Sequence, residues 1–125
     1  MMDRFRMHAV LPVSDLERAT SWYADTLGLK PTTEDQGGAW YEAPGCDFVL
    51  SPSPYAGTAQ NTCAEWQVEG LDEVMTDLRS RGVTFEEYDM PGFKTENGVM
   101  AAGAFRGAWF KDSEGNLLAL TERTG

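Results

Sequence analysis

Hydrophobic residues in the first third of the chain follow a strand pattern, then a helix pattern. Residues 5–13 alternate between apolar and polar side chains, which predicts a strand with Pro12 near its end. The next apolar residues recur three or four positions apart, which predicts a helix with one buried face. These helical positions are Leu16, Ala19, Tyr23 and Leu27.

Both ends of this helix carry termination signals. Ser14 and Glu17 have the spacing of a capping box, in which hydroxyl and carboxylate each accept a free backbone N–H at the helix start. Gly28 follows the last apolar position and predicts a left-handed helix end. Three extended segments follow, separated by turns rich in Gly and Pro, at residues 29–33, 39–43 and 47–51.

The same succession returns after residues 51–58, a stretch rich in Pro, Gly and Ser. Residues 62–68 predict a strand, and the apolar positions Leu71, Val74, Met75 and Leu78 predict a helix. Further strands are predicted at residues 83–88, 104–111 and 116–121, with a loop over residues 91–98.

The chain therefore repeats one unit. Val13 to Glu17 reads V-S-D-L-E and Val68 to Asp72 reads V-E-G-L-D, and the two helices end at Gly28 and Gly82. Two copies of one supersecondary unit have to pack together to bury a core, and a cleft forms between such units. We predict an α+β fold in a single domain of residues 1–125, with module one at about 1–53, a linker at about 54–60 and module two at about 61–125.

Charge and composition exclude several classes of partner. The net charge of −10 argues against nucleic acid and anionic membranes, which bind positive patches. No apolar run approaches the roughly 20 residues of a membrane span, and the first residues lack a signal-peptide pattern, so we expect a cytoplasmic protein. Cys46 and Cys63 do not predict a disulfide framework, and His8 is the one histidine, so one subunit cannot supply two imidazoles.

The string from Phe110 to Leu120, F-K-D-S-E-G-N-L-L-A-L, together with H-A-V-L-P-V-S-D-L-E from His8 to Glu17, resembles the vicinal oxygen chelate superfamily. That group includes glyoxalase I, bleomycin-resistance proteins, fosfomycin-resistance enzymes and extradiol dioxygenases. The resemblance covers the whole chain, and residues 52–61 are also similar to small bacterial members. It implies two βαβββ modules whose mixed, curled sheets surround a ligand cavity. In the enzymes, the first and last strands of each module hold a divalent metal there.

Under this resemblance, His8 matches the first metal-ligand position, Cys63 the equivalent in module two, and Ala119 a position where metal-dependent relatives have Glu. The corresponding strand of module one contains no Glu or His. A divalent ion in an enzyme typically takes about three protein donors, and a methyl group donates none. We therefore expect no metal and no cofactor. By strand alternation, Glu65 and Gln67 share the face of Cys63 and would be the residues to restore a site.

A metal-free cleft suits an apolar or aromatic ligand, because aromatic side chains at its rim can stack on such a molecule. The candidate ligand-binding residues are His8, Trp40, Phe48, Tyr55, Cys63, Glu65, Gln67, Phe93, Met100, Phe105 and Trp109. Our first hypothesis is a metal-independent small-molecule binding protein of the bleomycin-resistance type, acting as a homodimer. The alternative is an enzyme, a glyoxalase- or dioxygenase-like lyase or oxidoreductase, with an altered metal site or with His8 as general base.

Overall fold

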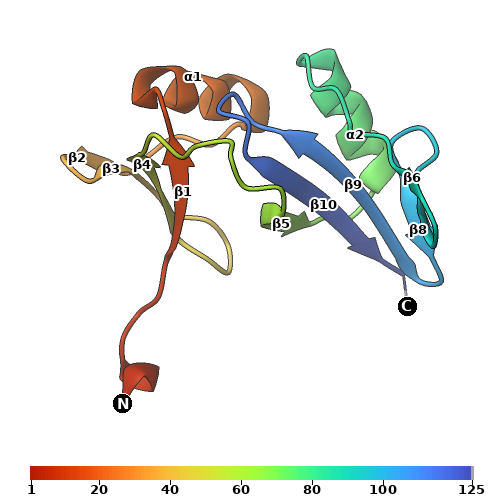
Figure 1. The fold of residues 1–125 in the computed structure, drawn as a ribbon. Helices are drawn as coiled ribbons and strands as arrows, with labels where there is room; N and C mark the ends of the chain where they lie inside the picture. Colours follow the sequence, from red (N-terminus) through yellow and green to blue (C-terminus); the bar gives the residue numbers. More distant parts are fainter. Residues whose placement is uncertain (125) are drawn as a thin grey trace.

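A computed structural model describes residues 1–124; Gly125, the last residue of the predicted domain, lies outside the described residues. Module one contains a four-stranded sheet and one helix (Figure 1). Strand β1 pairs in parallel with β4, and the sheet order is β1-β4-β3-β2. The elements are β1 (Ala9–Val13), α1 (Leu16–Leu27), β2 (Thr33–Asp35), β3 (Gly38–Tyr41) and β4 (Phe48–Pro52).

Module two repeats this arrangement, with sheet order β5-β10-β9-β8 and β5 parallel to β10. Its elements are β5 (Thr62–Gln67), α2 (Leu71–Ser80), β8 (Met100–Ala102), β9 (Phe105–Lys111) and β10 (Leu117–Arg123). A short hairpin of β6 (Asp89–Met90) and β7 (Phe93–Lys94) lies between α2 and β8, and a 3-10 turn, η1 (Met2–Arg4), precedes β1. The prediction of an α+β fold made of two βαβββ modules is confirmed, and neither sheet closes into a barrel.

Each helix covers one face of its own sheet. On α2, Leu71, Met75 and Leu78 are buried against Leu118, Leu120 and Phe110 of the sheet. On α1, Ala19 and Tyr23 are buried against β1, β3 and β4. Because side chains alternate along a strand, the neighbouring positions of both sheets face away from the helices. Neither helix of the described chain has both the length and the apolar character that a bilayer crossing requires.

Several predicted boundaries were wrong for reasons of strand pairing. Residues 5–8 are not part of β1, because β4 first offers a partner at Phe48, opposite Ala9. The strand predicted at residues 29–33 occurs at 33–35, where β3 lies alongside. Of residues 83–88, only Phe85 forms a bridge, to Phe110. The loop predicted at residues 91–98 contains β7, which pairs with β6.

The predicted capping box at the start of α1 was also wrong. The N-cap is Asp15, whose carboxylate accepts the Arg18 amide at 3.0 Å. The amide and hydroxyl of Ser14 instead donate to the carboxylate of Glu114, at 3.0 and 3.1 Å. Glu114 belongs to module two, so a long-range acceptor replaces the local partner Glu17.

The turn from Asp112 to Asn116 joins the two modules through buried polar groups. The Tyr23 hydroxyl donates to the Asp112 carboxylate at 2.7 Å. The side-chain amide of Asn116 donates to the Asp112 carboxylate at 3.0 Å and to the Pro12 carbonyl at 2.7 Å. Burial, and then the neighbouring Asp112 carboxylate, raise the pKa of Tyr23. The hydroxyl therefore stays protonated, and the turn holds module one against β10.

Candidate binding site

A row of three side chains crosses the helix-free face of the module-one sheet. The pairing aligns Val10 of β1 with Val49 of β4, and Val49 with Trp40 of β3. Val10 remains 58% exposed, and the exposed ring of His8 lies against Trp40 with centroids 4.8 Å apart. The Trp40 indole N–H donates to Asp35 at 3.0 Å, which fixes the ring orientation. Val49 is only 3% exposed, so the open part of this face consists of Val10 and the half-buried Trp40 ring.

Module two carries the equivalent row. Glu65 of β5 lies opposite Ala119 of β10, and Ala119 lies opposite Trp109 of β9. The Trp109 ring is covered by Phe93 at 5.2 Å and by Tyr88 at 6.0 Å between centroids. By strand position, Trp109 corresponds to Trp40, and Ala119 to Val49. The repeat thus places a tryptophan at the same point of both sheets, each beside a small apolar residue.

The donor set does not fit a divalent metal ion. The central positions of the two rows are Val49 and Ala119, whose aliphatic side chains donate no electron pair. In the β5–β10 pairing, Leu117 lies opposite Thr62 and Leu118 lies opposite Ala64, so Cys63 between them has no partner on β10. The Cys63 side chain packs against the module-one core. Cys63 therefore departs from the alternation that would have placed it beside Glu65. Within residues 1–124, no group of three or more His, Cys, Asp or Glu side chains converges.

A groove of about 650 Å³ separates β1 from β5. Four of the residues predicted from the sequence line it, namely Phe48, Cys63, Glu65 and Gln67. The other lining residues are Ala9, Leu11, Ala43, Pro44, Gly45, Cys46, Ala64 and Trp66. Four of them, residues 43–46, lie in the turn between β3 and β4, which carries no chemical signal in the sequence, and the others lie on β1 and β5. The half-buried Trp66 ring packs against the module-two core and also reaches the groove.

The other candidate residues lie outside the groove. His8 and Trp40 share one sheet face, and Phe93 and Trp109 form the aromatic cluster of module two. Tyr55 is 73% exposed in the linker. The two remaining candidates lie on neighbouring strands: Met100 of β8 is opposite Gly107, and Phe105 of β9 lies beneath the Arg123 guanidinium at 5.5 Å.

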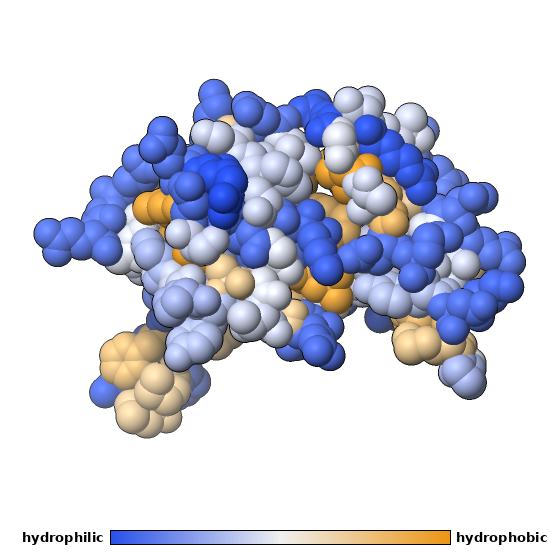
Figure 2. Space-filling model, turned by 45° about the horizontal axis from the view of Figure 1, so that its top comes forward, coloured by the Kyte–Doolittle hydropathy of each residue, from blue (hydrophilic) through white to orange (hydrophobic). Residues whose placement is uncertain are grey.

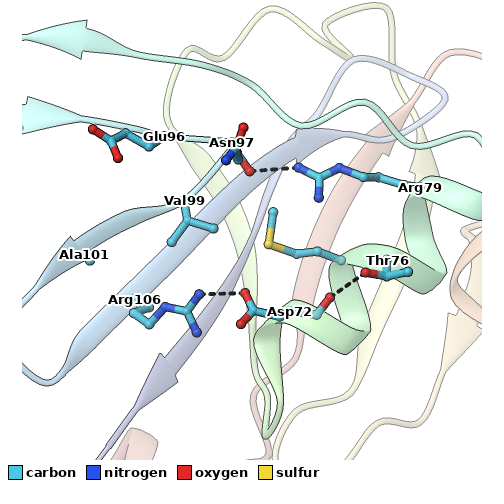
Figure 3. Close-up of a pocket in the computed structure, with 9 residues that line it drawn as sticks. Asp72, Thr76, Arg79, Glu96, Asn97, Val99, Ala101 and Arg106 are labelled. Atoms are coloured by element: carbon cyan, nitrogen blue, oxygen red, sulfur yellow. Dashed lines mark hydrogen bonds and ion pairs between the residues drawn. The ribbon is translucent and has the colours of Figure 1, made fainter.

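A second hollow, of about 400 Å³, lies between α2 and the strands β8 and β9 (Figure 3). Two guanidinium groups point into it from opposite sides. Arg106 donates to Asp72 at 2.6 Å, and Arg79 donates to the Asn97 carbonyl at 2.8 Å. Arg106 is also paired with Glu122, so its charge is neutralised within the chain. None of the residues predicted as a site from the sequence lines this hollow.

Comparison with known families decides the relationship. The family model for the Glyoxalase/Bleomycin resistance protein/Dioxygenase superfamily matches residues 7–120. The chain belongs to this superfamily. The resemblance found in the sequence is thereby confirmed. A search among curated proteins finds no match.

Solved structures of this superfamily's fold align over nearly the whole chain. UcmS2 has a TM-score of 0.72 at 21% identity, covering 94% of this chain and 98% of its own. The fosfomycin resistance protein FosX from Listeria monocytogenes has a TM-score of 0.71 at 16% identity, covering 96% and 93%. A glyoxalase/bleomycin resistance protein from Catenulispora acidiphila has a TM-score of 0.65 at 24% identity, covering 96% and 99%. At these identities the likeness concerns the fold.

Proposed function

We propose that this protein binds an apolar or aromatic small molecule without a metal ion and sequesters it, as bleomycin-resistance proteins do. One observation carries the proposal: each sheet places a half-buried tryptophan at the equivalent position, Trp40 beside the buried Val49 and Trp109 beside the buried Ala119. An aromatic pair is worth about 0.5–1.5 kcal/mol beyond area burial, and apolar surface adds about 25 cal/mol per Å² removed from water.

The groove between the modules adds shape and charge to this proposal. Its lining is largely apolar, and Glu65 is the one carboxylate among the described residues that line it. A ligand with a positive charge or hydrogen-bond donors would pair with that carboxylate, and the net charge of −10 would attract such a ligand over a longer range. We include in the proposal the cytoplasmic location and the homodimer expected from the sequence, and a role in resistance to a toxic compound.

The catalytic alternative has less support. A general base has to be held in position to take a proton. The His8 imidazole is exposed and lies beside Trp40, and within residues 1–124 no hydrogen bond fixes either of its ring nitrogens.

Titration of tryptophan fluorescence tests the proposal. Purified protein is titrated with a panel of aromatic and cationic antibiotics and metabolites, and at least one compound is expected to quench emission saturably. Trp40→Phe and Trp109→Phe should each remove part of that signal and weaken binding. Met90→Leu, at an exposed residue of module two that is not a candidate ligand-binding residue, is the control and should leave the affinity unchanged. No saturable response across the panel, or one equivalent of tightly bound metal in the purified protein, would contradict the proposal.

A further inference from the structure

The hollow between α2 and the strands β8 and β9 lies on the opposite face of the module-two sheet from the aromatic cluster (Figure 3). Ala108 and Phe110 of β9 are buried in one cluster with the residues of α2, and Arg106 has the same parity on this strand. Trp109 has the opposite parity and faces away from the helix. A molecule bound in the hollow would therefore be separate from the ligand of the proposed function.

One side of the hollow presents an arginine whose charge is not neutralised. The Arg79 guanidinium donates to the Asn97 carbonyl at 2.8 Å and lies over the Phe85 ring at 5.1 Å, and within residues 1–124 no carboxylate pairs with it. An arginine has five N–H donors, so most of those of Arg79 remain available to an anion. Gly98 leaves the necessary room, because a Cβ there would lie 3.2 Å from Nη2 of Arg79.

The other side of the hollow carries more negative than positive charge. Arg106 donates to Asp72 at 2.6 Å and to Glu122 at 3.1 Å, so two carboxylates share one guanidinium. The Asp72 side chain is 76% exposed, and its Oδ2 atom accepts no hydrogen bond in the described chain. Asp72 is therefore free to pair with a cation as well.

Helix geometry sets the distance between these two charges. Asp72 and Arg79 both lie on α2 and line the same hollow, and their separation in sequence corresponds to about 10 Å along the helix axis. Two ion pairs of about 3 Å each leave about 4–5 Å between the charged groups of a bound molecule. That spacing suits a β- or γ-amino acid, in which two or three methylene groups separate the ammonium from the carboxylate.

The surface between the two charges is apolar. Met75 lies between Asp72 and Arg79 on α2 and is 1% exposed. The half-buried Val99 projects from the sheet side, between Asn97 and Arg106 (Figure 3). Hydrophilic side chains cover most of the surface that Figure 2 shows, so such an apolar floor distinguishes the hollow from its surroundings. The methylene groups of a ligand would cover it and remove it from water.

The internal repeat shows that packing a helix on this sheet does not require the two arginines. The helix starts align Leu16 with Leu71, so Arg79 corresponds to Ala24, and by strand position Arg106 corresponds to Gly37. Module one has a hollow at the equivalent place, and no cationic side chain of the described chain lines it. Its lining residues are Leu16, Glu17, Thr20, Glu34, Asp35 and Gln36.

We propose that the hollow of module two binds a small zwitterion, a β- or γ-amino acid. Its carboxylate pairs with Arg79, its ammonium pairs with Asp72, and its methylene groups cover Met75 and Val99. A simple carboxylate would be repelled by Asp72 and by Glu96, which also lines the hollow, and a simple amine would be repelled by Arg79. The proposal goes beyond the proposed function, and its failure would leave the aromatic ligand unaffected, because the two sites lie on opposite faces of the sheet.

Amide chemical shifts of the isotope-labelled full chain test where the zwitterion binds. Titration with γ-aminobutyrate should shift the amides of residues 72–79 and 96–101 saturably. The amides of residues 33–36, beside the hollow of module one, should not respond. No saturable shift, or equal shifts beside both hollows, would overturn the proposal. This measurement uses the unaltered chain, so it does not depend on the folding of a variant.

The same titration with truncated ligands tests whether both charges are read. Butyrate lacks the ammonium and butylamine lacks the carboxylate, and each should bind about three- to fivefold more weakly, as the loss of one solvent-exposed ion pair implies. Equal affinity for γ-aminobutyrate and butyrate would reveal an anion site, and equal affinity for γ-aminobutyrate and butylamine a cation site. Either result refutes a zwitterion site.

Two variants assign the charges to their partners. Arg79→Gln should weaken γ-aminobutyrate without affecting butylamine, whereas Asp72→Asn should weaken γ-aminobutyrate without affecting butyrate. Arg81→Gln is the matched control, because it makes the same change of charge at the same end of α2 on a side chain that does not line the hollow. The assignment fails if Arg81→Gln weakens binding as much as Arg79→Gln, or if either hollow variant weakens all three ligands equally.

Discussion

Replacing Glu114 by Gln should destabilise the protein by an amount that depends strongly on pH. The Glu114 side chain is fully buried, and its carboxylate accepts hydrogen bonds from the amides of Ser14 and Asp15 at 3.0 and 2.9 Å and from Arg18 at 2.9 and 3.0 Å. The hydroxyls of Ser14 and Ser113 complete the set at 3.1 and 2.8 Å. Glutamine keeps one oxygen but turns an N–H₂ group towards these donors.

The magnitude follows from the ionisation of this carboxyl group. Burial by itself would raise the pKa of Glu114, but the hydrogen bonds from Arg18, Ser113, Asp15 and Ser14 outweigh it and lower the pKa to about 2, from an ordinary value of 4.5. That difference corresponds to about 3 kcal/mol of folding free energy. Because the folded-state pKa is the lower one, this stability is fully present above about pH 4.5 and disappears as the pH falls towards 2.

Urea unfolding followed by circular dichroism measures the effect. Glu114→Gln should lower the free energy of unfolding by about 3 kcal/mol at pH 7, and by much less near pH 2, where the unaltered carboxyl group is largely protonated. Glu17→Gln is the matched control, since the sequence pattern assigned helix capping to Glu17 while the structure assigns that role to Glu114. If Glu17→Gln costs more than Glu114→Gln, or if the loss at Glu114 does not vary with pH, the reasoning is refuted.

Two further pairs of variants test the core and the backbone. Tyr41→Phe should raise the free energy of unfolding by about 1 kcal/mol in thermal melts, because the Tyr41 hydroxyl is buried with no hydrogen-bond partner in the described chain. Tyr23→Phe should instead lower it by about 1–3 kcal/mol, since it removes one of the hydrogen-bond donors to the buried Asp112 carboxylate. Gly38→Ala should cost at least about 3 kcal/mol, because the added Cβ would lie 1.9 Å from the Leu50 carbonyl oxygen. Gly103→Ala, with no atom within 4 Å of the added Cβ, should cost only about 1 kcal/mol.

Features that depend on local periodicity were predictable from the sequence. The apolar spacing of Leu71, Met75 and Leu78 identified the buried face of α2, and all three side chains are at most 6% exposed. Gly28 was predicted to end α1, and it does so with φ of 71°. These signals are strong because helix faces and left-handed helix ends are decided by neighbours within a few residues.

Features that depend on contacts distant in sequence were not predictable in this way. Strand alternation placed Cys63 beside Glu65, but the shift in pairing with β10 turns Cys63 towards the module-one core. The residue that binds the start of α1 is separated from Ser14 by 100 positions. No local pattern reveals either feature, because each depends on how module two pairs with itself or docks on module one.

The two helices differ in where their N-terminal carboxylate comes from, and this difference connects the modules. At the start of α2, the amides of Gly70 and Leu71 donate to Glu122 of the same module, at 3.0 and 2.9 Å. The position equivalent to Glu122 in module one is occupied by Pro52, which has no side-chain acceptor. Helix α1 therefore takes Glu114 from module two. In module one, Asp15 caps the helix locally, but the amides of Ser14 and Asp15 find their acceptor Glu114 only after the modules dock, so we expect the start of α1 to lose stability when the interface between the modules opens.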